Sequence, residues 1–449
     1  MEKIILVGSG GREHAIAWRL AQSPLVKEIV CVPGNGGTSN EEKCRNVSLD
    51  EAKGLDENPY IAIAKKYGCD FAVIGPEDPL ADGLADEFWT AGIPCVGPKK
   101  AAAQLEASKD FAKAFMKKYS VAAPASETFT EQAAAIEYVQ KRGAPIVLKA
   151  DGLAAGKGVV VAKTLDEAVA AVDDLMNSGR VGDAGKKLVV EDYLAGIEMS
   201  VLAAVSVTPD GEKEGKAAIV PFLPARDHKR LNDGAKGPNT GGMGAVCPLS
   251  DVTPEIMAAF DKNILRPTLD GLIKEGFDYR GFIFFGVMIT KDGPKLLEYN
   301  VRLGDPETQA VLPLMDFDFA SLCKAICEQS LKEFKMEWKS AYAVAPVAVS
   351  GGYPGSYQKG KRIFIDEKTI QDNEAKVFVA GAIEERREKR EALKENFLVT
   401  SGGRVLAVCA QDKDFDAAWK KAYAALKGIA FDGIFYRNDI GLPGAAVSD

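Results

Sequence analysis

The sequence predicts an α/β protein with an N-terminal parallel sheet, a central nucleotide-binding region and a β-rich C-terminal region. Three observations support this fold class. Apolar strands alternate with helices over the first 105 residues, two lysines frame a glycine-rich hairpin at 149–158, and most of the chain beyond about residue 335 is strand-like. A length of 449 residues also suggests about three domains.

The first region, residues 1–105, contains four apolar strand-like runs: KIILVG, EIVCVP, CDFAVIG and IPCVGP. Helical runs lie between them, and this alternation is typical of a doubly wound, Rossmann-like parallel sheet. Ligands bind such sheets at the carboxyl ends of the strands. The stretches GSGGRE, PGNGG and GPEDP follow three of these strands, so we expect a ligand site there.

The first of these stretches does not match a dinucleotide fingerprint. G-x-G-x-x-G requires a third glycine where this chain has Glu13, and no acid follows the second strand to bind a ribose. A loop before a helix can still hold one phosphate, and Arg12 can add a charged contact. A monophosphate ligand is therefore favoured over NAD, with a tight turn that binds nothing as the alternative.

The glycine-rich stretch KADGLAAGKGVVV, residues 149–161, is not a Walker A loop. That motif needs glycine at Asp151 and a hydroxyl at Gly158, and it needs a helix after the loop. Short β-branched runs flank the glycines on both sides, so we expect a hairpin whose bare tip closes over phosphates. The alternative is a flexible turn that binds nothing.

The rest of the central region is predicted as a helix over 106–120, a small α/β unit over 125–195, and a strand pair, GFIFFGVMIT and GPKLLEYNVR. The stretch LVVEDYLAGIEMSV is expected to be one strand whose end carries acids. A long polar loop, DHKRLNDGAKGPNTGGMGA, lies between these parts.

The strand LLEYNVR carries the clearest chemistry. Alternation puts Glu298, Asn300 and Arg302 on one face, and Leu297, Tyr299 and Val301 on the opposite face toward the core. A carboxylate and an amide oxygen two residues apart suit magnesium, and Arg302 suits an anion. Lys149 ends a buried strand, where a lysine normally needs an anionic partner. The alternative is a polar strand face turned toward solvent.

The third region is predicted to contain the strands AVAPVAVS, RIFIDE, KVFVAGAI and RVLAVCA and a closing helix, DFDAAWKKAYAALKG. Between them lies a dense charge run, EERREKREALKENF. We expect this run to be a solvated helix or loop.

The bulk properties narrow the classes of partner. A formal net charge of −8 disfavours nucleic acid, and no run approaches the ~20 apolar residues of a membrane span. Eight scattered cysteines and a start that enters a strand directly suggest reduced thiols and a cytoplasmic location. With only two histidines in the chain, a multi-histidine metal centre is excluded.

Together these motifs resemble the phosphoribosylamine–glycine ligase family of the ATP-grasp superfamily. The resemblance rests on GSGGREHA, IGPEDPL, VLKADGLAAGKGV, VEDYLAGIE, DHKR…GPNTGGMGA, EYNVRLGDPETQ, SGGRVLAV and YRNDIG, which run through nearly the whole chain in the family's order. Two departures are visible: Ala235 replaces the family's usual acid, and Ala380-Gly381-Ala382 replaces its AGT stretch.

The resemblance implies a Rossmann-like domain at 1–105, an ATP-grasp domain at 106–330 with a lid subdomain at about 123–194, and a C-terminal β-rich domain at 331–449. It implies ATP and Mg²⁺ or Mn²⁺ as cofactors, and glycine and 5-phosphoribosylamine as substrates. It implies neither a nucleic-acid nor a membrane partner. We expect a monomer, with a weak dimer as the alternative.

The resemblance also implies the site residues. For ATP they are Lys109, Lys149, Gly156, Lys157, Gly158, Glu191, Asp192, Tyr193 and Glu198; for the metal, Glu298 and Asn300; and for the chemistry itself, Arg302, Asp227 and Lys229. For phosphoribosylamine and glycine they are Gly8, Ser9, Gly10, Gly11, Arg12, Glu13, His14, Asn35, Gly75, Pro76, Glu77, Asn239, Thr240, Gly241, Gly242 and Asp305.

The implied reaction is attack of the glycine carboxylate on the γ-phosphate of ATP, followed by attack of the sugar amine on the glycyl phosphate. Two rivals remain: another ATP-grasp ligase, such as one that resembles biotin carboxylase, and a nucleotide-binding protein without catalysis. An NAD enzyme is already weakened by Glu13.

Overall fold

The computed structural model describes residues 2–153, 158–389 and 393–446, and its main feature is one nine-stranded sheet. In spatial order its strands are β11 (Ala218–Pro221), β10 (Ile197–Val207), β16 (Tyr279–Thr290), β5 (Cys95–Pro98), β4 (Phe71–Ile74), β1 (Glu2–Gly8), β2 (Val26–Pro33) and β3 (Cys44–Asn46), with β17 (Gly293–Asn300) paired to β16.

The parallel sheet predicted for the first region is confirmed. β1 lies parallel to β2 and β4, and β4 lies parallel to β5. The helices that pack on these strands are α1 (Gly11–Ala21), α2 (Pro59–Tyr67), α4 (Leu84–Thr90) and α13 (Phe319–Cys327). The sheet does not end at β5, because Tyr279 and Arg280 of β16 pair antiparallel with Pro98 and Gly97. The sequence did not predict this continuation into the central region.

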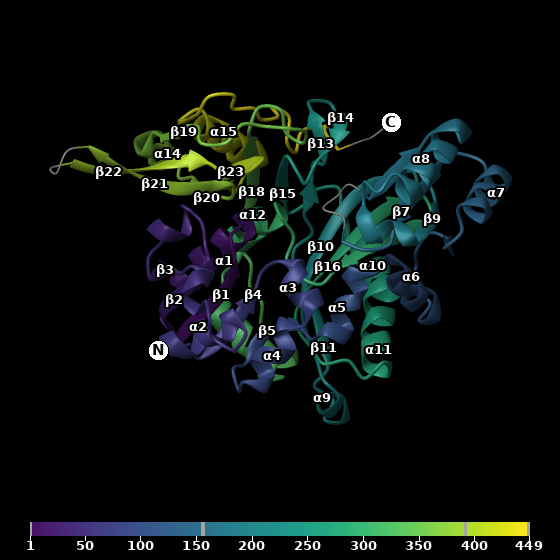
Figure 1. Ribbon diagram of the computed structural model, residues 1–449, viewed down its shortest axis with the longest axis horizontal. Coiled ribbons are helices and arrows are strands. Elements are labelled where there is room, and N and C mark those ends of the chain that lie inside the picture. The colour runs from purple at the N-terminus through teal and green to yellow at the C-terminus, as the bar shows by residue number, and fades with distance from the viewer. Residues whose placement is uncertain (1, 154–157, 390–392, 447–449) are drawn as a thin grey trace.

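A second, smaller unit has its own sheet and core. Its strands are β6 (Ser126–Phe129), β9 (Leu188–Asp192), β7 (Ile146–Ala150) and β8 (Val159–Ala162), with helices α7 (Gln132–Arg142) and α8 (Leu165–Asn177) packed on them. Its buried apolar side chains form a cluster separate from the main core. The predicted hairpin is confirmed, since Lys149 on β7 pairs with Val159 on β8. In Figure 1 this unit lies at the upper right, beyond the purple parallel strands.

The stretch LVVEDYLAGIEMSV is two strands, so the prediction of one continuous strand was wrong. β9 belongs to the small sheet and β10 to the nine-stranded sheet, with residues 193–196 between them. Gly196 lies so close to β16 that a Cβ on it would stand 2.2 Å from the carbonyl oxygen of Ile289. The chain therefore passes from one sheet to the other at a glycine, which an apolar pattern alone does not reveal.

Further helices lie between residues 77 and 311. They are α3 (Glu77–Asp82), α5 (Lys100–Ala107), α6 (Lys109–Lys118), α10 (Pro254–Phe260), α11 (Arg266–Lys274) and the short α12 (Glu307–Val311). The helix predicted over 106–120 is broken, because Ser108 ends α5 and its hydroxyl accepts a hydrogen bond from Phe111 N in α6. No helix in the described part of the chain is both long and apolar enough to span a bilayer.

The C-terminal region is rich in strands, as predicted. One sheet contains β12 (Arg226–Asp227), β15 (Gly244–Cys247), β18 (Tyr342–Val349), β23 (Arg404–Asp412) and β20 (Lys376–Val379), and α15 (Phe415–Leu426) packs on it. A four-stranded sheet contains β21 (Ala382–Lys389), β22 (Leu393–Thr400), β19 (Arg362–Ile365) and β24 (Ile429–Ala430), and a two-stranded sheet contains β13 (Arg230–Asn232) and β14 (Lys236–Asn239).

The charge run was predicted as a helix or loop, and this prediction was wrong. Its residues 384–389 and 393–397 lie in the β21–β22 hairpin, whose pairs run from Ala382 opposite Thr400 to Lys389 opposite Leu393, and residues 390–392 lie outside the described residues. Figure 1 shows this hairpin projecting from the body at the left. An exposed two-stranded ribbon tolerates charge on both faces, so dense charge does not distinguish it from a solvated helix.

Candidate active site

The larger of two cavities, with a volume of about 620 Å³, lies where the small sheet, α6, β17 and the loop after β12 meet. Segments far apart in the sequence contribute to its walls. The predicted residues that line it are Glu77, Lys109, Lys149, Gly158, Glu191, Asp192, Tyr193, Glu198, Asp227, Lys229, Asn239, Thr240, Gly241, Glu298, Asn300, Arg302 and Asp305. Gly156 and Lys157 lie outside the described residues.

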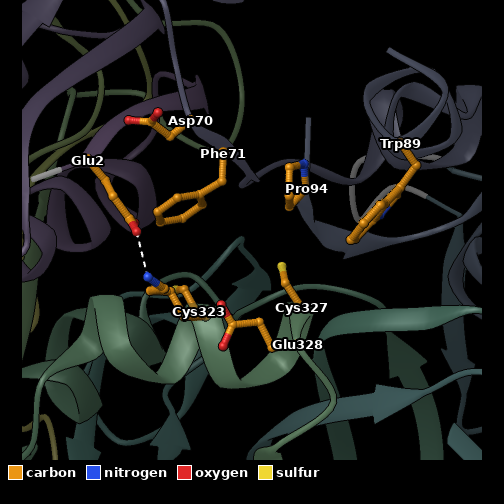
Figure 2. Close-up of a pocket in the computed structure, with 9 residues that line it drawn as sticks. Glu2, Asp70, Phe71, Trp89, Pro94, Cys323, Cys327 and Glu328 are labelled. Atoms are coloured by element: carbon orange, nitrogen blue, oxygen red, sulfur yellow. Dashed lines mark hydrogen bonds and ion pairs between the residues drawn. The ribbon is translucent and has the colours of Figure 1, made fainter. Parts of the chain in front are cut away.

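A second cavity, of about 230 Å³, lies at the opposite, amino-terminal ends of the parallel strands (Figure 2). Glu2, Phe71 and Pro94 line it near the starts of β1, β4 and β5, and Glu2 forms an ion pair with Lys324 at 2.6 Å. None of the predicted site residues in the described chain lines this cavity. The larger cavity is therefore the candidate active site.

Three lysines gather at one end of the larger cavity. Glu191 Oε1 on β9 lies 3.0 Å from Lys149 Nζ on β7 and 3.2 Å from Lys113 Nζ on α6. Burial lowers the pKa of Lys113 to about 8, although the charge of Glu191 opposes this shift. Lys113 was not predicted from the sequence, although its position one turn after Lys109 on the same helix was an available signal. Two buried ammonium groups thus share one carboxylate, which leaves this end positive.

Lys109 connects α6 to the glycine-rich hairpin. Its Nζ donates to the carbonyl oxygen of Gly152 at 2.7 Å, while Asp151 accepts from Ser108 Oγ at 3.0 Å and from Asp110 N at 3.1 Å. Burial also lowers the pKa of Lys109. The base of the hairpin is therefore attached to the start of α6, close to the other two lysines.

Glu298 and Asn300 line the cavity from β17, as their alternation predicted. Leu297 was expected on the opposite face, but it lines the cavity too, because a β-bulge in the β16–β17 ladder interrupts the alternation there. The fully buried neighbour is Leu296. Burial alone would raise the pKa of Glu298, but Lys229 and Lys149 hold it below its ordinary value.

These two side chains fit a hard divalent cation only in part. Among the described residues, no group of three or more His, Cys, Asp or Glu side chains is placed to hold a metal. One carboxylate and one amide oxygen are nevertheless the donor set expected where substrate phosphates supply other ligands of Mg²⁺. The arrangement therefore suits a metal that binds together with a nucleotide.

Arg302 lies in a network of carboxylates beside the metal-site candidates. Its Nη2 lies 2.9 Å from Glu106 Oε1, and its Nε lies 3.2 Å from Glu77 Oε2. Burial raises the pKa of Glu106 to about 7 despite the charge of Arg302. Arg404 holds Asp305 in the same way, with Nη2 at 2.9 Å from Asp305 Oδ2. Neither Glu106 nor Arg404 was predicted from the sequence: Glu106 lies outside the quoted motifs, and Arg404 lies in SGGRVLAV but was given no role.

Lys229 from the loop after β12, Asp227 from β12 and Glu198 from β10 also line the cavity. Lys229 Nζ lies 2.7 Å from Glu198 Oε2, and Glu198 raises the pKa of Lys229. Asp227 Oδ1 is buried and accepts no hydrogen bond from any described residue. Gly242 does not line the cavity, but a Cβ on it would stand 2.6 Å from Asp227 Oδ1, so its bare backbone gives this carboxylate room.

The N-terminal loops lie outside the boundary of this cavity. Gly8, Ser9, Gly10, Gly11, Arg12, Glu13, His14, Asn35, Gly75 and Pro76 are absent from its lining. Many of their polar groups are already used internally. Glu13 accepts from Gly10 N at 2.6 Å and from Arg12 Nε at 2.5 Å.

The side chains of Asn35 and His14 also form hydrogen bonds within the protein. Asn35 Nδ2 donates to Ser9 O and to Val379 O, both at 2.8 Å, which ties the N-terminal loops to the C-terminal region. His14 Nδ1 accepts from Val379 N at 2.8 Å, and its Nε2 lies 3.2 Å from Glu41 Oε2. Arg12 lies 3.7 Å from Glu77, which does line the cavity. The loops thus adjoin the cavity through Arg12 and Glu77. The amide of Gly10 is already hydrogen-bonded to the Glu13 carboxylate.

Family models match most of the chain. Residues 2–106 match the N domain of phosphoribosylglycinamide synthetase, residues 107–308 match its ATP-grasp (A) domain, and residues 343–443 match its C domain. A phosphoribosylamine–glycine ligase from Clostridium acetobutylicum is 47% identical over 439 residues, covering 98% of this chain and 99% of that protein.

Solved structures agree with these matches. The crystal structure of phosphoribosylamine–glycine ligase from Thermotoga maritima is similar with a TM-score of 0.77 and 33% identity, covering 98% of this chain and all of that one. The biotin carboxylase domain of Hydrogenobacter thermophilus 2-oxoglutarate carboxylase, in complex with MgADP and bicarbonate, has a TM-score of 0.68 at 13% identity and covers 97% of this chain and 91% of that one. The second likeness concerns the fold alone.

Proposed function

The chain belongs to the phosphoribosylglycinamide synthetase family, and from that membership we propose that the larger of the two cavities is the place where glycine is joined to 5-phosphoribosylamine. The chain is an ATP-dependent ligase of purine biosynthesis. The single observation that carries the placement is the convergence, in one cavity, of lysines from two units with Glu298 and Asn300.

The lysine end binds the phosphates of ATP. Lys109 and Lys149 contact them, and Lys113 joins these two because all three ammonium groups line the same wall. The backbone from Glu191 to Tyr193 receives the adenine, and Glu198 the ribose. Gly158, with Gly156 and Lys157, belongs to the hairpin that covers the phosphates. Support comes from the excess positive charge at this end, which an anionic ligand offsets.

Glu298 and Asn300 hold the divalent metal, which we propose to be Mg²⁺, with Mn²⁺ as the alternative. When bound, the metal neutralises phosphate charge during transfer. The protein contributes the strand that fixes both oxygens and the lysines that keep Glu298 ionised.

The chemistry proceeds by phosphoryl transfer to glycine. The glycine carboxylate attacks the γ-phosphate of ATP, and ADP leaves; the sugar amine then attacks the glycyl phosphate, an amide bond forms and phosphate leaves. Arg302, Asp227 and Lys229 orient the reacting groups, with Asn239, Thr240, Gly241, Gly242 and Asp305 around them. No covalent intermediate on the protein is needed, so catalysis depends on positioning and charge.

Phosphoribosylamine approaches from the N-terminal side. Its contacts are Arg12 and Glu77, with Glu13, His14, Asn35, Gly75, Pro76 and the backbone of Gly8, Ser9, Gly10 and Gly11 forming the wall behind them. Because Glu13 occupies the amide of Gly10, the sugar phosphate reaches this wall through Arg12 or through a shift of the Glu13 side chain.

Several coarser assignments go with this proposal. We divide the chain at residues 1–105, 106–330 and 331–449, with the lid at about 123–194, and we assign a monomeric, cytoplasmic protein. The eight cysteines, none of which is paired in a disulfide, agree with a reducing compartment.

The test is ADP formation from ATP, glycine and phosphoribosylamine, with each substrate omitted in turn. Full turnover should require all three. Turnover with bicarbonate in place of glycine would favour a ligase of the biotin carboxylase kind, and nucleotide binding without turnover under any condition would favour a binding protein.

A further inference from the structure

Two carboxylates that line the cavity, those of Asp227 and Glu307, have no ion-pair partner among the described residues. Asp227 stands on β12 and Glu307 begins α12, and both line the cavity. β12 pairs with β15, and α12 packs against β15, so this strand holds both elements in place. The two side chains are far apart in the sequence, and the fold brings them to the same wall.

Every nearby cation already has another partner. Lys229 pairs with Glu198, Arg302 with Glu106 and Glu77, and Arg404 with Asp305. Among the described residues, neither Asp227 nor Glu307 has a basic nitrogen within ion-pair distance, a limit of 4.0 Å. Two acids therefore face the cavity without a counter-ion, a costly arrangement for buried charge.

Hydrogen bonding does not fully compensate either group. Glu307 Oε1 accepts one bond from Ser200 Oγ at 2.9 Å, and Asp227 Oδ1 accepts none from the described chain. Burial raises the pKa of both carboxyls, and the charge of Glu307 raises the pKa of Asp227 further because the two groups repel. A cationic ligand group between them would remove this penalty.

Only one of the three substrates brings a permanent cation. ATP and the phosphate of phosphoribosylamine are anionic, and the sugar amine must be neutral to act as a nucleophile. Glycine carries an ammonium group that takes no part in the bond that forms. We propose that Asp227 and Glu307 bind the ammonium group of glycine and so direct its carboxylate toward the lysines and the metal site.

This assignment rests on the proposed function and deepens it. It explains why the bare backbone of Gly242 approaches Asp227 Oδ1, since a side chain there would close the space at this oxygen. It also accounts for selectivity toward glycine, because a two-carbon acid without an amino group would leave the negative charge of both carboxylates without a partner.

The test uses Glu307→Gln, which keeps the shape of the side chain and an oxygen that can accept from Ser200. Steady-state kinetics should show the KM for glycine rising about ten- to a hundredfold, with the KM for ATP nearly unchanged. Ser200→Ala, which leaves the carboxylate but removes its hydrogen bond, should raise the same KM only a few-fold. Glu2→Gln, at the second cavity, is the matched control and should change nothing.

A binding measurement distinguishes loss of ammonium recognition from a general disturbance of the site by the substitution. Calorimetry with glycine and with glycolate, in which a hydroxyl replaces the ammonium, should show that Glu307→Gln loses affinity for glycine while its weak affinity for glycolate changes little. Equal losses for both ligands would overturn the proposal. So would a rise in the KM for phosphoribosylamine instead of glycine, or a defect that added Mg²⁺ relieves, since the pair would then hold a metal.

Asp227→Asn provides the same comparison if Glu307→Gln fails to fold, which thermal melting detects. Failure of the proposed function itself would look different, because the unchanged enzyme would then form no product from glycine at all.

Discussion

Lys109, Lys113 and Lys149 contribute positive charge to the cavity, and Glu191 lies within ion-pair distance of the last two. Burial lowers the pKa of Lys113 to about 8, so this ammonium loses its proton at a lower pH than an ordinary lysine does. A bound phosphate would stabilise the charged form and raise that pKa. At the residue scale, the site is thus prepared for an anion before any anion binds.

Glu298→Gln tests the metal site. The substitution removes the negative charge but keeps the shape, so we expect kcat to fall by roughly a hundredfold or more, since the metal would lose its only ionised protein ligand. Lys291→Gln, at the turn of the same strand pair, is the control and should turn over normally. Normal turnover of Glu298→Gln at ordinary magnesium would rule out the assignment.

His228 is a buried neutral imidazole, and its effect belongs to stability. Gly441 N donates to its Nε2 at 3.0 Å, and its Nδ1 lies 3.2 Å from Gly244 O. Burial lowers its pKa from 6.5 to about 3. Because the unfolded chain takes up a proton near pH 6.5 and the folded chain does not, stability from this group is complete above pH 6.5 and is lost as pH falls toward 3.

His228→Gln should therefore melt below the parent at about pH 7.5, where two hydrogen bonds are weakened, and the gap should narrow at about pH 4.5. Melting temperatures of the two proteins at both values provide the measurement. A gap that widens on acidification would mean that His228 is charged in the folded protein.

At the scale of elements, the chain passes directly from β9 of the small unit into β10 of the nine-stranded sheet. β9 carries Glu191 and β10 carries Glu198, so the cavity is lined from both sides of this passage. Gly196 allows it, because β16 lies too close for a side chain.

Gly196→Ala should displace this passage and with it the nucleotide end of the cavity. We expect the KM for ATP to rise about tenfold, with a smaller change for glycine, because backbone clashes of this kind cost on the order of 1–3 kcal/mol. The neighbouring, exposed Ala195→Ser is the control. Identical ATP kinetics in Gly196→Ala and the parent would show that the passage does not position the nucleotide site.

Some elements of the fold could be predicted from the sequence, and others could not. The parallel strands and the β7–β8 hairpin followed from apolar runs and glycines, because local pattern decides them. The bulge at Leu297 and the junction at Gly196 did not follow, since contacts with β16 produce both. The charge run was predicted as a helix or loop rather than a β-hairpin, because strands and helices that face solvent have similar compositions.

At the scale of the whole molecule, the fold combines one continuous sheet with one separate unit. Pairing between β5 and β16 joins the N-terminal strands to the central region, and β15 pairs with β18 of the C-terminal region. The small unit keeps its own buried cluster. Most of the site residues predicted from motifs line the cavity. Glu106 and Glu307 were not predicted because they gain meaning only through these long-range contacts, whereas Lys113 could have been inferred from its place one turn after Lys109.

Hydrogen exchange should resolve this organisation. Amides of β6–β9 should exchange together and faster than those of β1, β4 and β16, since the small unit opens without disturbing the larger sheet. ATP should slow exchange in β7 and β9. Uniform exchange across both sheets, with or without ATP, would indicate a single cooperative unit.

The central claim is that the cavity activates the glycine carboxylate by phosphoryl transfer. The direct measurement is turnover with glycine labelled by ¹⁸O in both carboxylate oxygens, followed by mass analysis of the released phosphate. Attack of the carboxylate on the γ-phosphate predicts one ¹⁸O in each phosphate and one in the amide product. Phosphate free of ¹⁸O, with one label in the amide and the other released in water, would contradict the account.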